Sequence, residues 1–255
     1  FGTFDGVMQI LENIDDSTRI VSIVGPSIRP SELRLLAKLS KKIDIPLITQ
    51  PKQNSLEYKD FILQIQNLNY DSIISNCYSM IIRPDVLMYC NYNAINIHWS
   101  LLPLNRGPNP IQWSLIKNEK ITGATIHFID DGLDTGDIIE QEIVYIKSKD
   151  TWVNIKEKLI LVSNLLIKET LPKLFQNKYT RRKQNELIAT KNSRLNSDFP
   201  KINFSIMNDL EIYNLIRAQV KPLTGAYLDT ENERIYFSDF LNTQEVNEIR
   251  KKYEK

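Results

Sequence analysis

The residue types that could carry chemistry are concentrated between Asn96 and Gln141. Asn96 and His98 stand two residues apart in AINIH, which reads as a β-strand, so both side chains are expected on the same face. Asp134 stands inside the turn Gly132–Gly136, whose glycines are expected to permit a positive φ and a close backbone approach to a ligand. An amide donor, an imidazole and a carboxylate brought together would suit acyl transfer to an amine.

Each of these features also has an ordinary structural explanation. An N-x-H triplet on a strand is usually part of a core or a satisfied polar group, and Asp-Thr-Gly is a common turn. His127, the only other histidine, stands in the strand-like TIHFI, and we interpret it as structural. The case for a site therefore depends on the order and spacing of the features together.

The elements that would position these residues follow a βαβ pattern. Over the first 150 residues, short β-branched runs alternate with amphipathic stretches, which is typical of a parallel sheet. We expect helices to begin at Pro30 and after a cap at Asn54–Ser55, and a long helix over Thr151–Phe175. Strands are expected at 19–24, 46–49, 72–74, 94–98, 123–129 and 138–146. In such a sheet the carboxyl ends of the strands open on the crevice where ligands bind.

The remainder of the chain is predicted to form a linker and a small module. Residues 177–200 are polar and basic, and they form either a solvated connector or an arm that holds a phosphate; the basic residues are Lys178, Arg181, Arg182, Lys183, Lys191 and Arg194. After them we expect a helix over Asp209–Ala218, a hairpin of 225–228 with 234–237, and a charged helix over Asn242–Lys255. The predicted organisation is a catalytic domain over 1–176, a linker over 177–200 and a helix–hairpin–helix module over 201–255. The predicted fold class is α/β, a doubly wound, Rossmann-like, mostly parallel sheet with a small α+β C-terminal appendage.

The composition excludes several classes of protein. Hydrophobic residues make up 42% of the 255 residues, enough for a full core, and a net charge of +1 provides no field for holding nucleic acid. No apolar run approaches the roughly 20 residues that a membrane helix needs. Cys77 and Cys90 show neither CxxC nor Cys/His spacing, which argues against a disulfide framework or a metal site. We expect a cytoplasmic protein without a metal, although a chain that begins with Phe1 instead of Met leaves a targeting signal open.

The stretch from Asn96 onward resembles the folate-dependent formyltransferase family, which acts on methionyl-tRNA, glycinamide ribonucleotide and nucleotide sugars. The family's motifs are matched by NIHWSLLPLNRGPNP and by TGATIHFIDDGLDTGDII. The resemblance covers roughly residues 1–175, and Phe1-Gly2-Thr3 looks like the FGT that follows the family's first strand, so a truncated first strand is expected. A weaker match at Leu215–Ala218, Pro222 and Gly225–Tyr227 resembles the start of the family's C-terminal barrel.

The resemblance implies transfer of a formyl group from 10-formyltetrahydrofolate to an amine, with Asn96, His98 and Asp134 as catalytic residues. Asn96 would donate a hydrogen bond to the oxyanion, aided by protonated His98. Asp134 would orient His98 and help to remove the proton of the amine, and which of the two accepts it first stays open. The resemblance places the folate beside Met80, Ile81, Ile82, Asp130, Gly132 and Leu133.

Three acceptors compete: a tRNA, a nucleotide-linked amino sugar and another small amine. A tRNA demands many phosphate contacts, whereas residues 177–255 contain 14 Lys/Arg against 11 Asp/Glu, a net charge of +3, and are too few for a full barrel. For glycinamide ribonucleotide the C-terminal extension would be superfluous. We therefore expect an amino sugar used in surface polysaccharide (lipopolysaccharide O-antigen) synthesis, with a dTDP-4-amino-4,6-dideoxyhexose as the best match and the 3-amino isomer next.

The candidate acceptor contacts rest on resemblance to sugar N-formyltransferases, and they are Tyr78, Trp99, Asn105, Arg106, Asn109 and Trp113. Trp113 is equally well explained as a helix residue packed on the sheet. A non-catalytic folate-binding protein of the same fold is the alternative from a different class, and the intact set of Asn96, His98 and Asp134 argues against it. The expected partners are small molecules, folate and a nucleotide sugar, with neither nucleic acid nor membrane, and the hairpin could pair across a homodimer.

Overall fold

A computed structural model describes residues 1–196 and 198–254, which group into two units. Unit 1 comprises Phe1–His98, Thr125–Glu142 and Ser163–Asn185, and unit 2 comprises Trp99–Ala124, Ile143–Val162 and the chain from Glu186 onward. The segments of the two units therefore alternate along the sequence. The division into 1–176, 177–200 and 201–255 follows chain order instead, and it stays a prediction.

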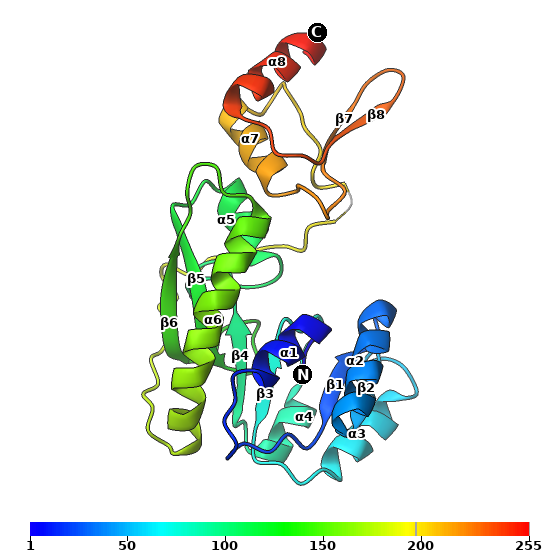
Figure 1. Ribbon diagram of the computed structural model, residues 1–255, viewed down its shortest axis with the longest axis vertical. Coiled ribbons are helices and arrows are strands. Elements are labelled where there is room, and N and C mark those ends of the chain that lie inside the picture. Colours follow the sequence, from blue (N-terminus) through cyan, green and yellow to red (C-terminus); the bar gives the residue numbers. More distant parts are fainter. Residues whose placement is uncertain (197, 255) are drawn as a thin grey trace. The chain divides into compact units, whose positions relative to one another are not determined.

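Parallel pairing organises the first four strands of unit 1 (Figure 1). β1 (Ile23–Pro26) pairs in parallel with β2 (Leu47–Gln50), and β3 (Ile73–Asn76) pairs in parallel with β4 (Ala94–His98). Gly2 connects the two pairs, because its N–H donates to the Val24 carbonyl at 3.2 Å and it forms a parallel bridge with Asn76. These features confirm the predicted α/β class with a mostly parallel sheet.

Two further strands extend this sheet beyond β4. β5 (Ile121–Phe128) pairs antiparallel to β4, and β6 (Ile138–Tyr145) neighbours β5. The expectation that the runs from 94–98 onward continue one parallel series is therefore wrong for β5. Hydrophobic runs alone do not reveal strand direction, because a buried strand has the same composition in either orientation.

Helices flank these strands, and most of them follow the predicted pattern. α2 (Pro30–Ile43) begins at Pro30, and α6 (Trp152–Phe175) matches the predicted long helix within one residue. The cap at Asn54–Ser55 is wrong: these residues lie in turns, and α3 (Tyr58–Gln66) follows Glu57 without a side-chain cap. Three short helices were not predicted, namely α1 (Phe4–Leu11), α4 (Pro84–Leu87) and the 3-10 helix η1 (Met88–Cys90).

The apolar core of unit 1 holds the strands and helices together. Phe61, Ile65, Val86 and Leu87 are each at most 2% exposed and pack with residues of β1, β2 and β3. Burying a side chain of this size stabilises the folded state by about 1.5–3 kcal/mol. Among residues 1–196 and 198–254, no helix is long and apolar enough to cross a membrane.

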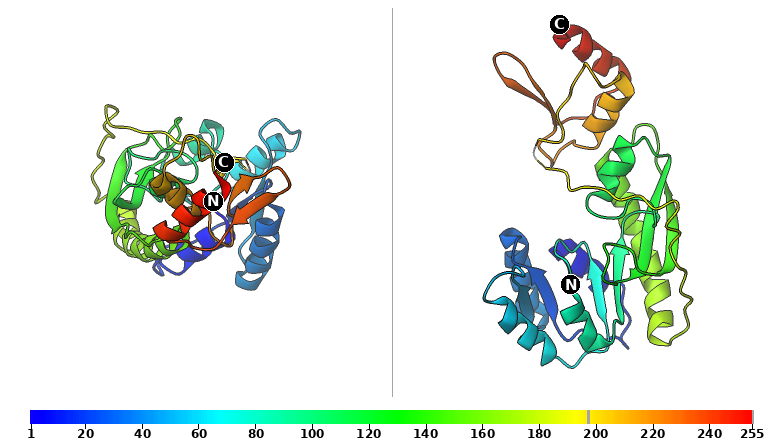
Figure 2. Two further views of the ribbon diagram at one scale, coloured as in Figure 1. Left: turned by 90° about the horizontal axis from the view of Figure 1, so that it is seen from above. Right: turned by 180° about the vertical axis from the view of Figure 1, so that it is seen from behind.

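Unit 2 contains the helix–hairpin–helix elements that the sequence predicts. α7 (Asp209–Arg217) and α8 (Thr243–Tyr253) lie near the hairpin of β7 (Ala226–Asp229) and β8 (Arg234–Phe237) in Figure 2. Both helices begin with a capping box, Asn208 with Glu211 and Asn242 with Glu245, which satisfies N–H groups at their first turns. Ile212, Ile216 and Val246 are fully buried in a shared cluster, and α5 (Pro110–Ile116) contributes Ile116 to it.

Residues 177–196 contain no helix, and bridges tie them to other segments at several points. In unit 1, Arg182 and Ile138 exchange both backbone hydrogen bonds, at 2.8 and 2.9 Å. In unit 2, Lys191 forms a parallel bridge with Arg106. The stretch is therefore an arm that follows other segments of the protein, and its proposed contact with a phosphate stays a prediction.

The close approach of α1 to the end of β3 predicts that Gly6 cannot be replaced by alanine. A Cβ on Gly6 would overlap the backbone carbonyl oxygen of Asn76. Alanine favours a helix by about 1 kcal/mol over glycine, but overpacking against backbone costs about 1–3 kcal/mol or more. We expect Gly6→Ala to lower the free energy of unfolding by about 2 kcal/mol, measured by urea denaturation. The control is Asp5→Ala at the exposed neighbouring position, and a Gly6→Ala protein as stable as wild type would contradict this packing.

Candidate active site

The register of β4 and β5 places four polar side chains on one face of the sheet. Asn96 lies opposite His127, and His98 lies opposite Thr125. Residues directly opposite each other in an antiparallel pair project to the same side, and alternate residues on each strand do so as well. Asn96 and His98 therefore share a face, as predicted, and β5 adds His127 and Thr125 to it.

The turn after β5 brings a carboxylate to the same group of residues. Asp134 itself has a φ of 55°, in the left-handed region, while neither Gly132 nor Gly136 has a positive φ. The expected positive φ of the glycines is therefore wrong, and steric room within the turn accounts for them, while their close approach to a ligand stays a prediction. A Cβ on Gly132 would overlap the Thr135 hydroxyl, and one on Gly136 would overlap the Phe128 carbonyl oxygen.

The carboxylate of Asp134 lies between two imidazoles. Its Oδ2 is 3.6 Å from Nδ1 of His98, and its Oδ1 is 3.7 Å from Nε2 of His127. The two rings are nearly perpendicular, with centroids 6.3 Å apart. The side chains of Asp134 and His98 are 13% and 8% exposed, so solvent screens this cluster weakly. The structure thus brings together the predicted trio of Asn96, His98 and Asp134, while their catalytic roles stay predictions.

Hydrogen bonds define the tautomer of His127 and the orientation of Asn96. Nδ1 of His127 is 2.8 Å from the Phe128 carbonyl, which can only accept, so this nitrogen carries the proton. Its Nε2 then accepts from Nδ2 of Asn96 at 3.2 Å. The amide nitrogen of Asn96 carries a second N–H that this bond does not use, so the group can still donate to a ligand.

Burial keeps His127 neutral at physiological pH. Desolvation lowers the pKa of its ring from 6.5 to about 4, and the nearby Asp134 carboxylate opposes this change only partly. Its place within a strand predicts a structural role for His127, and the structure puts it in contact with two members of the trio, Asn96 and Asp134. In the sequence, the spacing of two residues from Thr125 indicates that His127 and Thr125 share a face of their strand. Only the register with β4 shows that this face also carries Asn96 and His98.

The predicted folate contacts lie on two loops of unit 1. On the first loop Ile82 is buried, while Ile81 is 71% exposed and its carbonyl accepts from Nε2 of Gln50 at 3.0 Å. On the second, Leu133 is 39% exposed, and Oδ1 of Asp130 accepts from Gly132 N–H at 3.0 Å. The structure therefore presents apolar side chains from both loops, and the folate contacts of Met80, Ile81, Ile82, Asp130, Gly132 and Leu133 stay predictions.

Two of the predicted acceptor contacts are buried residues that bond to carboxylates within unit 2. Asn105 is 2% exposed, and its amide donates to the Glu119 carboxylate at 2.9 and 3.0 Å. The guanidinium of Arg106 donates to both carboxylate oxygens of Glu186, at 2.6 and 2.9 Å. This pairing holds the pKa of Glu186 below its usual value. Glu186 therefore engages the guanidinium of Arg106 within the protein, and the contact of Arg106 with an acceptor stays a prediction.

The other predicted acceptor contacts are divided between the units. In unit 2, Trp113 lies on α5, donates from Nε1 to the Ser193 carbonyl at 2.9 Å and packs against Phe199 with ring centroids 5.1 Å apart. Oδ1 of Asn109 accepts from Leu195 N–H at 3.2 Å, and Trp99 is half-buried. In unit 1, Tyr78 donates its hydroxyl to Oε1 of Gln50 at 2.8 Å, and burial raises the pKa of that hydroxyl. All four residues have polar or aromatic partners within the protein, and their contacts with an acceptor stay predictions.

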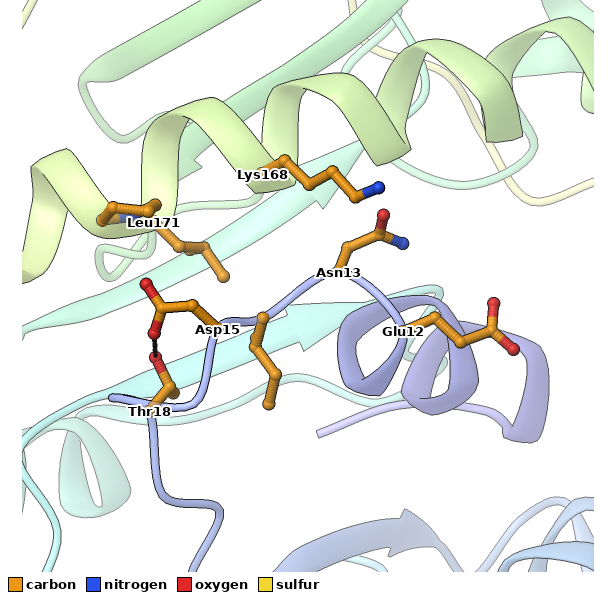
Figure 3. A pocket seen from close by; sticks show the side chains of 8 residues that line it. Glu12, Asn13, Asp15, Thr18, Lys168 and Leu171 are labelled. Carbon is orange, nitrogen blue, oxygen red and sulfur yellow. Dashed lines mark hydrogen bonds between the residues drawn. The ribbon is translucent and has the colours of Figure 1, made fainter.

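A separate polar pocket of unit 1 does not include these residues. Figure 3 shows Lys168 of α6 above Asn13, with Asp15 accepting from the Thr18 hydroxyl at 3.2 Å. The pocket has a volume of about 240 Å³, and none of the residues predicted for the site lines it. Within the described part of the chain, no group of three or more His, Cys, Asp or Glu side chains could hold a metal ion.

Known proteins resemble this chain in sequence and in fold. Residues 2–170 match the family described as formyl transferase. The methionyl-tRNA formyltransferase of Thermodesulfovibrio yellowstonii is 35% identical over 211 residues, which are 83% of this chain and 66% of that protein. The chain belongs to the formyl transferase family, a family of enzymes.

Two solved structures show the same fold. A 4-N formyltransferase from Francisella tularensis superposes with a TM-score of 0.73 at 24% identity, over 94% of this chain and 93% of its own. The sugar 3N-formyl transferase WlaRD, crystallised in the presence of dTDP and 5-N-formyl-THF, superposes with a TM-score of 0.67 at 21% identity, over 93% and 92%. At these identities the comparison supports the shared fold over nearly the whole chain.

The depressed pKa of His127 predicts a pH-dependent stability. A histidine titrates near 6.5 in the unfolded chain and near 4 in this folded protein, so its contribution is present above pH 6.5 and lost as the pH falls towards 4. We expect wild type to lose about 2–3 kcal/mol more unfolding free energy than His127→Gln between pH 7.5 and pH 4, since one pKa unit is about 1.4 kcal/mol. Urea denaturation at a series of pH values checks this, and parallel pH profiles for the two proteins would contradict it.

Proposed function

We propose that this chain transfers a formyl group from 10-formyltetrahydrofolate to the amino group of a nucleotide-linked amino sugar. The observation that carries the proposal is the cluster of Asn96, His98 and Asp134 in a member of the formyl transferase family. The exposed apolar side chains of Ile81 and Leu133 fit the flat ring system of a folate. The sugar 3N-formyl transferase WlaRD shares the fold over 92% of its length, and we extend its acceptor class to this chain as a proposal.

The proposed roles follow from the chemistry of each group. The nitrogen of the acceptor amine bonds to the formyl carbon while the C=O π bond opens onto oxygen, and the amide of Asn96 donates a hydrogen bond to the resulting oxyanion. The proton lost by the amine passes to the pair of His98 and Asp134. When the C=O bond re-forms, the bond between the formyl carbon and the nitrogen of tetrahydrofolate breaks, and that nitrogen takes up the proton. Such a donor contributes about 2.7–4 kcal/mol to stabilisation of a transition state. Asp134 holds the His98 ring at 3.6 Å and stabilises its positive charge when it carries a proton. His127 keeps the Asn96 amide in the orientation that directs N–H groups, not its oxygen, toward that region.

The acceptor proposal depends on charge and on the form of the C-terminal segment. Residues 177–255 have a net charge of +3, from 14 Lys/Arg and 11 Asp/Glu, and they supply helices α7 and α8 and one hairpin. Such a segment suits a ligand with one diphosphate better than a tRNA with many phosphates. A dTDP-4-amino-4,6-dideoxyhexose is the proposed substrate, and the 3-amino isomer is the next candidate.

A methionyl-tRNA acceptor is the second candidate function. The observation in its favour is the 35% identity to the Thermodesulfovibrio yellowstonii enzyme. That match covers 66% of the relative, whereas the Francisella tularensis structure is covered over 93% of its length. The two candidates share the formyl-transfer chemistry and differ in how they respond to salt.

Replacement of either His98 or Asp134 should strongly lower turnover. We expect His98→Asn and Asp134→Asn to fold normally and to lose at least about 10²–10³ in kcat, because the proposed stabilisation acts in the transition state. The measurement is steady-state formyl transfer with the amino sugar, with urea denaturation as the check on folding. Asp71→Asn, at an exposed position, is the control. Retention of more than about a tenth of wild-type turnover by either variant would overturn its catalytic assignment.

Acceptor identity can be tested by mass gain and by salt dependence. The protein is incubated with 10-formyltetrahydrofolate and a panel of dTDP- and UDP-amino sugars, with initiator methionyl-tRNA in parallel. We expect an amino sugar to gain one formyl group, and its KM to rise only weakly between 50 and 200 mM salt, because one diphosphate releases few counterions. Efficient formylation of the tRNA with a steep loss of affinity in salt would overturn the acceptor assignment and leave formyl transfer intact.

A further inference from the structure

Gln184, a residue of the arm, contacts the turn that carries Asp134. Its side-chain nitrogen Nε2 donates to the carbonyl oxygen of Asp134 at 2.9 Å and to that of Gly136 at 2.8 Å. A primary amide nitrogen carries two N–H groups, so each carbonyl can receive one of them. Fifty residues of sequence separate Gln184 from Asp134, and both lie in unit 1.

The turn contains one residue in the left-handed region of backbone conformation. Asp134 has a φ of 55°, which aspartate adopts more readily than most residues with a side chain but at a higher free energy than a right-handed conformation. Within the loop, Oδ1 of Asp130 accepts from the Thr135 hydroxyl at 2.6 Å, and the Asp137 carbonyl accepts from Phe128 N–H at 2.9 Å. These bonds hold both ends of the turn, and the two bonds from Gln184 hold carbonyls on either side of Thr135.

Arg182, two residues before Gln184, attaches the arm to β6. Arg182 exchanges both backbone hydrogen bonds with Ile138, and its guanidinium donates to Oε1 of Gln141 at 2.7 Å. The Gln141 amide in turn donates to the hydroxyl of Thr125 at 2.9 Å, on the strand that carries His127. The guanidinium of Arg181 lies 3.7 Å from the centre of the Phe128 ring. The side-chain amide of Gln184 is therefore presented by a segment that is hydrogen-bonded to β6 and stacked on Phe128 of β5.

We propose that Gln184 is a positioning residue for Asp134: its amide holds two carbonyls of the turn and so keeps the Asp134 carboxylate between His98 and His127. The expected effect of Gln184 on catalysis rests on the proposed function. Its effect on the turn does not, because the geometry of the turn exists without any substrate. The peptide that follows Asp134 cannot rotate without moving the Asp134 carbonyl away from Gln184. A turn without the clamp can relax toward more common backbone conformations, and the carboxylate then leaves the contact with the imidazoles.

A double-mutant cycle tests the catalytic consequence. Gln184→Leu replaces the amide with a slightly shorter apolar side chain that cannot donate, and we expect it to lower kcat about tenfold to a hundredfold with KM for the acceptor changed less than about twofold. In the Asp134→Asn background the same substitution should change kcat less than about twofold, because its effect acts through Asp134. An equal fold-loss in both backgrounds would show that Gln184 acts independently of Asp134 and would overturn the proposal.

The matched control is Gln176→Leu, the same substitution at an exposed glutamine just before the arm. It should leave kcat, KM and the urea midpoint at their wild-type values. Losses of activity in Gln176→Leu equal to those in Gln184→Leu would assign the effect to the arm in general and not to the clamp.

A second measurement does not depend on formyl transfer. The chain has two histidines, and Asp134 contacts both, so their ring ¹⁵N signals report on the cluster. We expect Gln184→Leu to move these signals in the same direction as Asp134→Asn, and Gln176→Leu to leave them unchanged. Histidine signals identical to wild type in a folded Gln184→Leu protein would overturn the positioning role. If the wild-type enzyme transfers no formyl group, the proposed function fails, while the NMR comparison still decides the role of Gln184.

Discussion

The antiparallel pairing of β5 with β4 is the constraint on which the whole cluster depends. It places His127 opposite Asn96 and Thr125 opposite His98, so that two strands contribute to one face. A slip of one residue would turn both side chains of β5 to the other face and remove the acceptor that orients the Asn96 amide. The end of β5 also determines where the next turn begins, because Phe128 N–H donates to the Asp137 carbonyl at 2.9 Å. Asp134 is thus located by the same strand that locates His127.

The electrostatic character of the cluster follows from this packing. His127 is 2% exposed, and burial costs a charged ring more than the neighbouring carboxylate returns, which keeps it neutral. A neutral ring with its proton on Nδ1 offers a lone pair at Nε2, and this lone pair decides which way the Asn96 amide faces. In the proposed mechanism His127 therefore acts as a fixed acceptor, and His98, at the end of β4, is the imidazole that takes part in proton transfer.

The sequence predicted those features that depend on local spacing. The alternation in AINIH was enough to place Asn96 and His98 on one face, and helical periodicity located α2, α6, α7 and α8. It could not predict the direction of β5, because a buried strand has the same composition whether it runs parallel or antiparallel. It also missed the partners of Arg106 and Asp134, since Glu186 and Gln184 lie 80 and 50 residues away and no local pattern relates them. The left-handed conformation was assigned to the glycines of the turn, whereas long-range bonds maintain it at Asp134.

The arm illustrates how differently two neighbouring side chains can act. Gln184 holds the Asp134 turn through two neutral hydrogen bonds, which salt does not screen. Glu186 holds Arg106 through a bidentate ion pair, but its own side chain is 70% exposed, so solvent and salt weaken the pair. Three backbone hydrogen bonds, from Arg106 N–H to Thr190, from Thr190 N–H to Pro103 and from Asn192 N–H to Arg106, keep that part of the arm in place at 2.8–3.1 Å even when the ion pair opens. Arg106 could therefore exchange the carboxylate of Glu186 for a phosphate without detaching the arm, whereas the turn of Asp134 has no comparable freedom.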